Sequence, residues 1–167
     1  MNSRKRNPRV VYWLDNSLYL NITNRCSNYC YFCFRRFKNG IQDFNLKLEK
    51  EPTSEEVIEE LQQVINRKNW KEVVFCGFGE PLERLDLVLE ATKWIKKNHS
   101  KPVRVDTNGQ GYLLNRGREV TNNMSTFLNK SFSYSICLRV TYEKPESSST
   151  QSYTERLSSI LPAKNEN

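Results

Sequence analysis

The chain has 167 residues, of which 37% are hydrophobic, with 26 Lys and Arg against 19 Asp and Glu. This length predicts one domain with a modest core, and no apolar run approaches the roughly 20 residues that a membrane helix needs. The apolar run at residues 10–14 is also too short for a secretory signal, so we expect a cytoplasmic protein without a membrane partner.

The excess of positive charge is concentrated near the N-terminus. Residues 1–40 contain eight Lys and Arg and one Asp, a balance of +7 that equals the formal net charge of the whole chain. A local basic patch of this kind attracts nucleic acid, faces an anionic cofactor, or remains a solvated arm. We expect residues 1–16 to form a basic N-terminal arm.

The first predicted elements are a strand and a helix on either side of a cysteine-rich segment. Residues 17–23 alternate apolar and polar side chains, which predicts a strand, and the cysteines follow it directly up to a turn at Asn39-Gly40. Thr53 and Glu56 have the spacing of a capping box and predict a helix start. The apolar stripe of that helix comprises Val57, Leu61, Val64 and Ile65.

The next elements continue the alternation of strands and helices. We expect a strand at residues 73–76, a helix at residues 85–97 and a strand at residues 103–107. This order predicts an α/β fold with a parallel sheet and flanking helices. Ligands of such sheets bind at the carboxyl ends of the strands, and each of the three candidate motifs below follows a strand.

The pattern after residue 110 is weaker. Residues 120–128 predict a short helix, and residues 132–140 alternate well enough for a fourth strand. Residues 147–159 are rich in Ser and Thr and offer little to bury, so we expect residues 141–167 to form a polar, flexible tail.

Three of the five cysteines, Cys26, Cys30 and Cys33, lie within eight residues in a CxxxCxxC pattern. An odd cysteine count with this crowding indicates metal ligands or catalytic groups rather than disulfides. In a helix the three would share a face, but the polar segment before them favours a wrapping loop. Iron–sulfur clusters normally take four thiolates, so three leave one iron open, as a catalytic site requires. Zinc is the alternative and would need a fourth ligand nearby.

Three motifs together resemble the radical S-adenosylmethionine superfamily. The first is CxxxCxxC after the first strand, the second is GFGEP at residues 77–81, similar to the family's GGEP, and the third is DTNG at residues 106–109. Within the superfamily, the first 125 residues or so look most like the small proteins associated with TatD-type nucleases. Organic-radical-activating enzymes share the same motifs and remain an alternative.

The resemblance implies cofactors and their ligands. Cys26, Cys30 and Cys33 would hold a 4Fe–4S cluster whose fourth iron binds S-adenosylmethionine. Reductive cleavage would give methionine and a 5′-deoxyadenosyl radical that abstracts hydrogen from an unknown substrate. The other residues that the resemblance assigns to cofactor binding are Gly77, Phe78, Gly79, Glu80, Asp106 and Asn108. Phe78 departs from the pattern, since it replaces the second glycine of GGEP. The expected partners are an electron donor of flavodoxin or ferredoxin type and a substrate linked to a TatD-type nuclease.

The remaining side chains near the cysteines have plainer interpretations. Arg35 and Arg36 are expected as surface charges, Cys76 and Cys137 as structural residues, and His99 as an exposed residue after a helix. The aromatic residues around the cysteines form either core or a shell that shields a cluster; they are Tyr29, Tyr31, Phe32, Phe34 and Phe37.

The region after about residue 130 does not look like the family's continuation. We therefore expect residues 17–140 to form a partial (βα) barrel of radical S-adenosylmethionine type that is incomplete at the C-terminus. Two functions then compete: an enzyme that cleaves S-adenosylmethionine, and a non-catalytic module that binds an iron–sulfur cluster or another metal.

Overall fold

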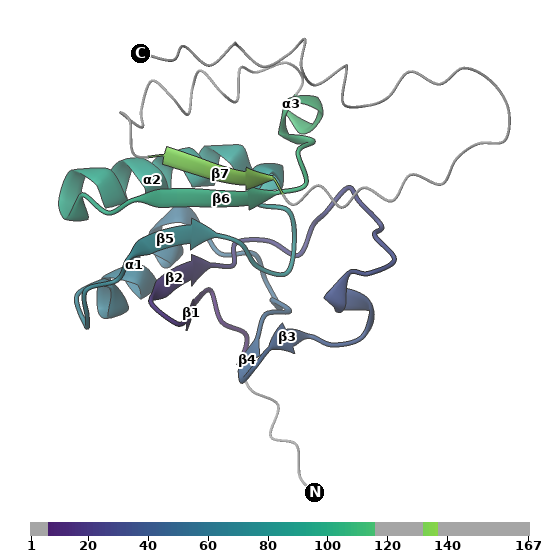
Figure 1. The fold of residues 1–167 in the computed structure, drawn as a ribbon, viewed down its shortest axis with the longest axis horizontal. Helices are drawn as coiled ribbons and strands as arrows, with labels where there is room; N and C mark the ends of the chain where they lie inside the picture. The colour runs from purple at the N-terminus through teal and green to yellow at the C-terminus, as the bar shows by residue number, and fades with distance from the viewer. Residues whose placement is uncertain (1–6, 116–131, 137–167) are drawn as a thin grey trace, which may run out of the picture.

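A five-stranded sheet forms the centre of the protein (Figure 1). The computed structural model describes residues 7–115 and 132–136. The strands lie in the order β1 (Val11–Leu14), β2 (Ser17–Leu20), β5 (Glu72–Phe75), β6 (Val103–Thr107) and β7 (Phe132–Ile136). β1 pairs antiparallel with β2, and every other neighbouring pair is parallel. The predicted α/β class with a mostly parallel sheet is therefore confirmed.

Two long helices cover one face of this sheet (Figure 1). α1 spans Ser54–Ile65 and α2 spans Leu85–His99. The predicted capping box starts α1: the Thr53 hydroxyl accepts a hydrogen bond from the Glu56 amide at 3.2 Å, and the Thr53 amide donates to the Glu56 carboxylate at 2.7 Å. These bonds satisfy two of the backbone groups that a helix start otherwise leaves unpaired.

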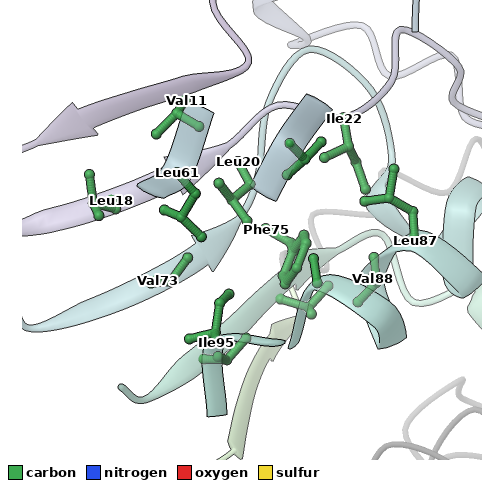
Figure 2. Packing of buried hydrophobic residues seen from close by; sticks show 14 of the residues in the cluster. Val11, Leu18, Leu20, Ile22, Leu61, Val73, Phe75, Leu87, Val88 and Ile95 are labelled. Carbon is green, nitrogen blue, oxygen red and sulfur yellow. The ribbon is translucent and has the colours of Figure 1, made fainter. Parts of the chain in front are cut away.

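The hydrophobic core lies between the sheet and the two helices (Figure 2). Alternate strand residues point into it, because successive side chains of a strand lie on opposite faces. β5 contributes Val73 and Phe75, which have no exposed surface. The other core residues include Leu18, Leu20, Val57, Leu61, Ile65, Val88, Ala91, Ile95, Val103 and Val105.

The opposite face of the sheet is more polar, although Val74 and Tyr12 on it are also buried. Arg104 on β6 donates two hydrogen bonds to the Glu72 carboxylate, at 3.1 and 3.2 Å, and a further one to Asp106. The rings of Tyr12 and Tyr19 stack on this face with centroids 5.1 Å apart. Burying a charged side chain without a partner is costly, and on this face the charged side chains are paired with one another rather than packed in an apolar core.

Several short elements were not predicted from the sequence. β1 lies within residues 1–16, for which we expected an arm. A two-stranded hairpin of β3 (Gly40–Ile41) and β4 (Phe44–Asn45) follows the cysteine segment. The remaining short elements are the 3-10 helices η1 (Phe34–Arg36) and η2 (Pro81–Arg84) and the one-turn helix α3 (Gly111–Leu114).

Other expectations are met only in part. The predicted strand at residues 132–140 is seen as β7 over residues 132–136, and its last four residues lie outside the described residues. The predicted helix at residues 120–128, Cys137 and the tail at residues 141–167 also lie outside them. The described strands form an open sheet, so the partial barrel stays a prediction. His99 ends α2 rather than following it, and it lies half-buried against the Trp94 ring. None of the helices in the described part of the chain has the length and apolarity needed to cross a membrane.

Candidate functional site

The three motifs lie at the carboxyl ends of three neighbouring strands (Figure 1). The cysteine loop follows β2, the GFGEP turn follows β5, and residues 106–109 contain the end of β6 and the turn after it. Because β2, β5 and β6 are parallel, these three segments meet at one edge of the sheet. This is the edge at which the sequence predicts ligand binding.

The GFGEP turn packs directly on the segment that leads into the cysteine loop. A Cβ on Gly77 would lie 2.2 Å from the Asn21 amide oxygen, and one on Gly79 would lie 2.3 Å from the Arg25 carbonyl oxygen. The Glu80 amide donates a hydrogen bond of 2.7 Å to that same carbonyl. Both glycines are therefore required by contact between two parts of the chain itself.

Glu80 joins the second motif to the third. Its side chain is buried, and one carboxylate oxygen accepts hydrogen bonds from the Leu82 amide at 3.0 Å and the Thr107 hydroxyl at 2.7 Å. The other oxygen accepts from the Asn108 amide at 2.6 Å. Burial raises the pKa of the Glu80 carboxyl, and these hydrogen bonds partly oppose the rise. Glu80 thus acts first as an internal bridge between the turns after β5 and β6.

Asn108 connects the third motif to the first. Its side-chain amide lies 3.8 Å from the Cys26 sulfur, as a donor to it. Close by, the Ser27 hydroxyl donates a hydrogen bond of 2.8 Å to the Gln110 side chain. The start of the cysteine loop is therefore held against the turn that follows β6.

Asp106 lies apart from these contacts. It is on the polar face of β6, where it pairs with Arg104 and hydrogen-bonds Cys76. Burial raises the pKa of the Asp106 carboxyl, and Arg104 opposes the rise. The described contacts thus bring Glu80, Asn108 and Cys26 together, and they join Asp106 to the polar face instead.

The three motif cysteines share one loop and are half-buried. No α-helix forms there, so the loop prediction is confirmed; the Cys33 amide donates to the Cys30 carbonyl at 3.1 Å before η1 begins. Within the described ranges, no three Cys, His, Asp or Glu side chains come close enough together to form a metal site. The thiols therefore have a common loop but do not converge on one point.

The chemistry of the donor set nevertheless fits a thiolate-bound group. Residues 24–41 contain three cysteines and no Asp, Glu or His, so sulfur is the only metal-binding side chain that the loop offers. Soft sulfur ligands select iron–sulfur clusters or zinc rather than magnesium or calcium. None of the three is in a disulfide bond.

Two residues that hold this site together were not singled out from the sequence, Asn21 and Thr23. Asn21 is fully buried, and its side chain accepts a hydrogen bond from the Phe78 amide at 2.8 Å while it donates to the carbonyls of Leu46 and Arg9. Thr23 is also buried and hydrogen-bonds the Glu51 carboxylate. The only available signal was that these two polar residues interrupt an apolar strand just before the cysteines.

The aromatic residues of the loop do not belong to the core. Tyr29 has 83% of its surface exposed and Phe37 has 76%, and Tyr31 and Phe32 are exposed as well. Of the two alternatives that the sequence left open for these residues, the core is therefore wrong, and the shell around a cluster stays a prediction. Phe34 alone is half-buried, with its ring against that of Phe78.

Comparison with known proteins gives one family. The model of the radical SAM superfamily matches residues 20–121, which is more than half of the chain and includes all three motifs. No curated protein matches the sequence.

Proposed function

Since the chain belongs to the radical SAM superfamily, we propose that it binds a 4Fe–4S cluster through Cys26, Cys30 and Cys33 and binds S-adenosylmethionine next to it. When bound and reduced, the cluster would supply the electron that splits S-adenosylmethionine into methionine and a 5′-deoxyadenosyl radical for hydrogen abstraction from a substrate. The observation that carries this proposal is that three family motifs, distant in sequence, touch one another at one edge of the sheet.

The protein's own residues have separate roles in this proposal. The cysteines supply sulfur ligands, and the backbone of Gly77, Phe78 and Gly79 would bind the methionyl end of the cofactor. The contact of the Asn108 amide with the Cys26 sulfur supports a position for Asn108 beside the cofactor.

The two carboxylates of the motifs differ in how far their contacts support cofactor binding. Glu80 already accepts three hydrogen bonds through its two oxygens. Its role in cofactor binding is therefore to hold the turns after β5 and β6 in place. Asp106 stays in the proposed cofactor set through the family resemblance alone, because its contacts with Arg104 and Cys76 belong to the polar face of the sheet.

Anaerobic reconstitution with iron and sulfide tests the cluster. Wild type is expected to take up close to four irons per chain and to show the electron paramagnetic resonance signal of a reduced 4Fe–4S cluster. Serine variants of Cys26, Cys30 and Cys33 should lose the cluster, whereas Cys76→Ser should keep it, because Cys76 lies outside the loop. Zinc uptake without iron would contradict the proposal.

Catalysis is tested separately by adding S-adenosylmethionine to the reduced protein. Formation of 5′-deoxyadenosine supports the enzyme. A stable cluster that binds S-adenosylmethionine without cleaving it would support the second candidate, a non-catalytic module. The observation that favours that candidate is the open sheet formed by the described strands.

The finer identity and the partners also belong to this proposal. We assign the chain to the group associated with TatD-type nucleases, with an organic-radical-activating enzyme as the alternative, and we expect a flavodoxin- or ferredoxin-type electron donor. Arg36 and Lys38 are exposed, as are the rings of Tyr29 and Phe37, and the Arg36 guanidinium lies over the Tyr29 ring; such a basic, aromatic surface suits an acidic protein partner. Copurification with a TatD-type nuclease, and reduction of the cluster by flavodoxin that weakens with salt, would test these two partners.

A further inference from the structure

The end of the cysteine loop folds back onto the GFGEP turn. The rings of Phe34 and Phe78 meet edge to face, with centroids 5.7 Å apart and an interplanar angle of 84°. The guanidinium carbon of Arg35 lies 5.6 Å from the centroid of the same Phe78 ring. This is within the distance at which a cation is attracted to an aromatic face.

Arg35 also connects the two ends of the loop. One of its terminal nitrogens donates to the Asn24 carbonyl at 3.0 Å and makes a longer contact of 3.4 Å with the Phe78 carbonyl. Asn24 precedes the first cysteine and Arg35 follows the last one. A single side chain therefore spans the loop that carries all three thiols.

Phe78 is a fixed point to which the loop is attached. Its amide donates a hydrogen bond of 2.8 Å to the fully buried Asn21 side chain, and that side chain is itself held by two backbone carbonyls. The neighbouring Arg36 differs, because its guanidinium lies over the exposed Tyr29 ring, inside the loop. Of these two adjacent arginines, Arg35 is the one that contacts the rest of the fold through Phe78.

We propose that Arg35 and Phe78 form a latch that holds the cysteine loop against the GFGEP turn before any metal is bound. Both side chains act as positioning groups through the loop, and the backbone of Phe78 keeps its separate proposed place at the cofactor. A glycine at position 78, as the family motif has it, would lack the ring on which Arg35 and Phe34 pack. The latch consists of contacts within the chain itself, and its use in cluster assembly rests on the proposed function.

The latch is tested on the full-length protein without metal. Backbone hydrogen exchange of residues 24–36 and alkylation of the three motif thiols both report opening of the loop. Arg35→Ala and Phe78→Ala should each raise these rates about tenfold, since each removes a cation–π contact and Arg35→Ala also removes a hydrogen bond. The matched control is Arg36→Ala, which removes a cation–π contact within the loop but none with the GFGEP turn, so it should raise both rates far less than Arg35→Ala.

A double variant and a conservative one separate the latch from general loosening. Residues that act on the same contact are not additive, so Arg35→Ala combined with Phe78→Ala should exchange little faster than either single variant. Phe78→Tyr keeps the ring and should restore slow exchange. Slow exchange of the β2 and β5 amides shows that a variant is folded. If Phe78→Ala is not folded, Phe78→Leu replaces it, because it also removes the aromatic ring.

The outcomes distinguish this inference from the proposed function. Equal rates in Arg35→Ala and Arg36→Ala, or fully additive effects in the double variant, would overturn the latch whether or not the protein takes up iron. If wild type forms no cluster, the proposed function fails while the exchange data still decide the latch. If it does form one, Arg35→Ala should lose iron to a chelator about tenfold faster than Arg36→Ala.

Discussion

Replacing Gly79 by alanine is expected to destabilise the protein strongly, because the new methyl group has no room. Its Cβ would lie 2.3 Å from the Arg25 carbonyl oxygen and 2.6 Å from the Thr23 carbonyl oxygen. An ordinary carbon–oxygen contact is about 3.3 Å, so the two segments must separate by about 1 Å. Both atoms belong to the backbone and cannot turn away.

The size of the effect follows from two contributions. Overpacking by one methyl group costs about 1–3 kcal/mol. Separation of the segments also breaks the hydrogen bond from the Glu80 amide to Arg25, which contributes about 1 kcal/mol. Gly79→Ala should therefore lower the free energy of unfolding by about 2–4 kcal/mol, which corresponds to a urea midpoint about 1–2 M lower.

Gly111→Ala is the matched control for this experiment. Its Cβ would also lie 2.3 Å from a neighbour, but that neighbour is the terminal methyl of Leu82, which is buried and yet can shift through its side-chain torsions as a backbone carbonyl cannot. Gly111 does not have a positive φ, so alanine there also restricts the unfolded chain and favours folding by about 0.4–1 kcal/mol. Urea unfolding followed by circular dichroism should place Gly111→Ala within about 1 kcal/mol of wild type. Equal midpoints for the two variants would refute the reasoning.

Three other changes have expected outcomes. Thr53→Ala removes the capping box of α1 and should cost about 1 kcal/mol in thermal unfolding, and an unchanged melting temperature would contradict that role. Burial raises the pKa of the Cys76 thiol to about 12 from its ordinary value near 9, so the stability that it contributes is present below pH 9 and is lost as the pH rises toward 12. Cys76→Ala should therefore flatten the alkaline fall in stability, and parallel curves for the two proteins would argue against it. Partial burial raises the pKa of Glu72, but hydrogen bonding and charge attraction from Arg104 outweigh it and leave that pKa lowered. The ionised Glu72 carboxylate therefore stabilises the folded protein at neutral pH, and this stabilisation is lost on acidification. Arg104→Met should therefore cost about 2 kcal/mol at pH 7 and clearly less at pH 4, and an equal cost at both pH values would count against the ion pair.

The long elements could be predicted because local signals agreed with the final packing. The strand before the cysteines, the helix after Thr53 and the strand at residues 103–107 all have the period of the element they form. β1 was missed because Val10, Val11, Tyr12, Trp13 and Leu14 do not alternate with polar residues. The β3–β4 hairpin has two residues per strand, too few for any period to show.

Part of the candidate site could likewise be predicted from the sequence, and part could not. Its cysteines and turns could be found from motif spacing, and so could their position at the ends of strands. The contacts that join them could not, because they depend on three-dimensional proximity between residues far apart in sequence. Asn21 and Phe78 are 57 positions apart, and Asn108 and Cys26 are 82 apart. Arg35 was expected as a surface charge because sequence alone does not show which of two adjacent arginines turns inward.

The bridge made by Glu80 has a consequence for recombining this protein with relatives. Its carboxylate takes donors both from its own turn and from the turn after β6. A chimera that imports residues 77–81 without a carboxylate at position 80 would leave the Thr107 hydroxyl and the Asn108 amide without their acceptor. The two turns therefore stay compatible in recombination as long as that carboxylate is kept.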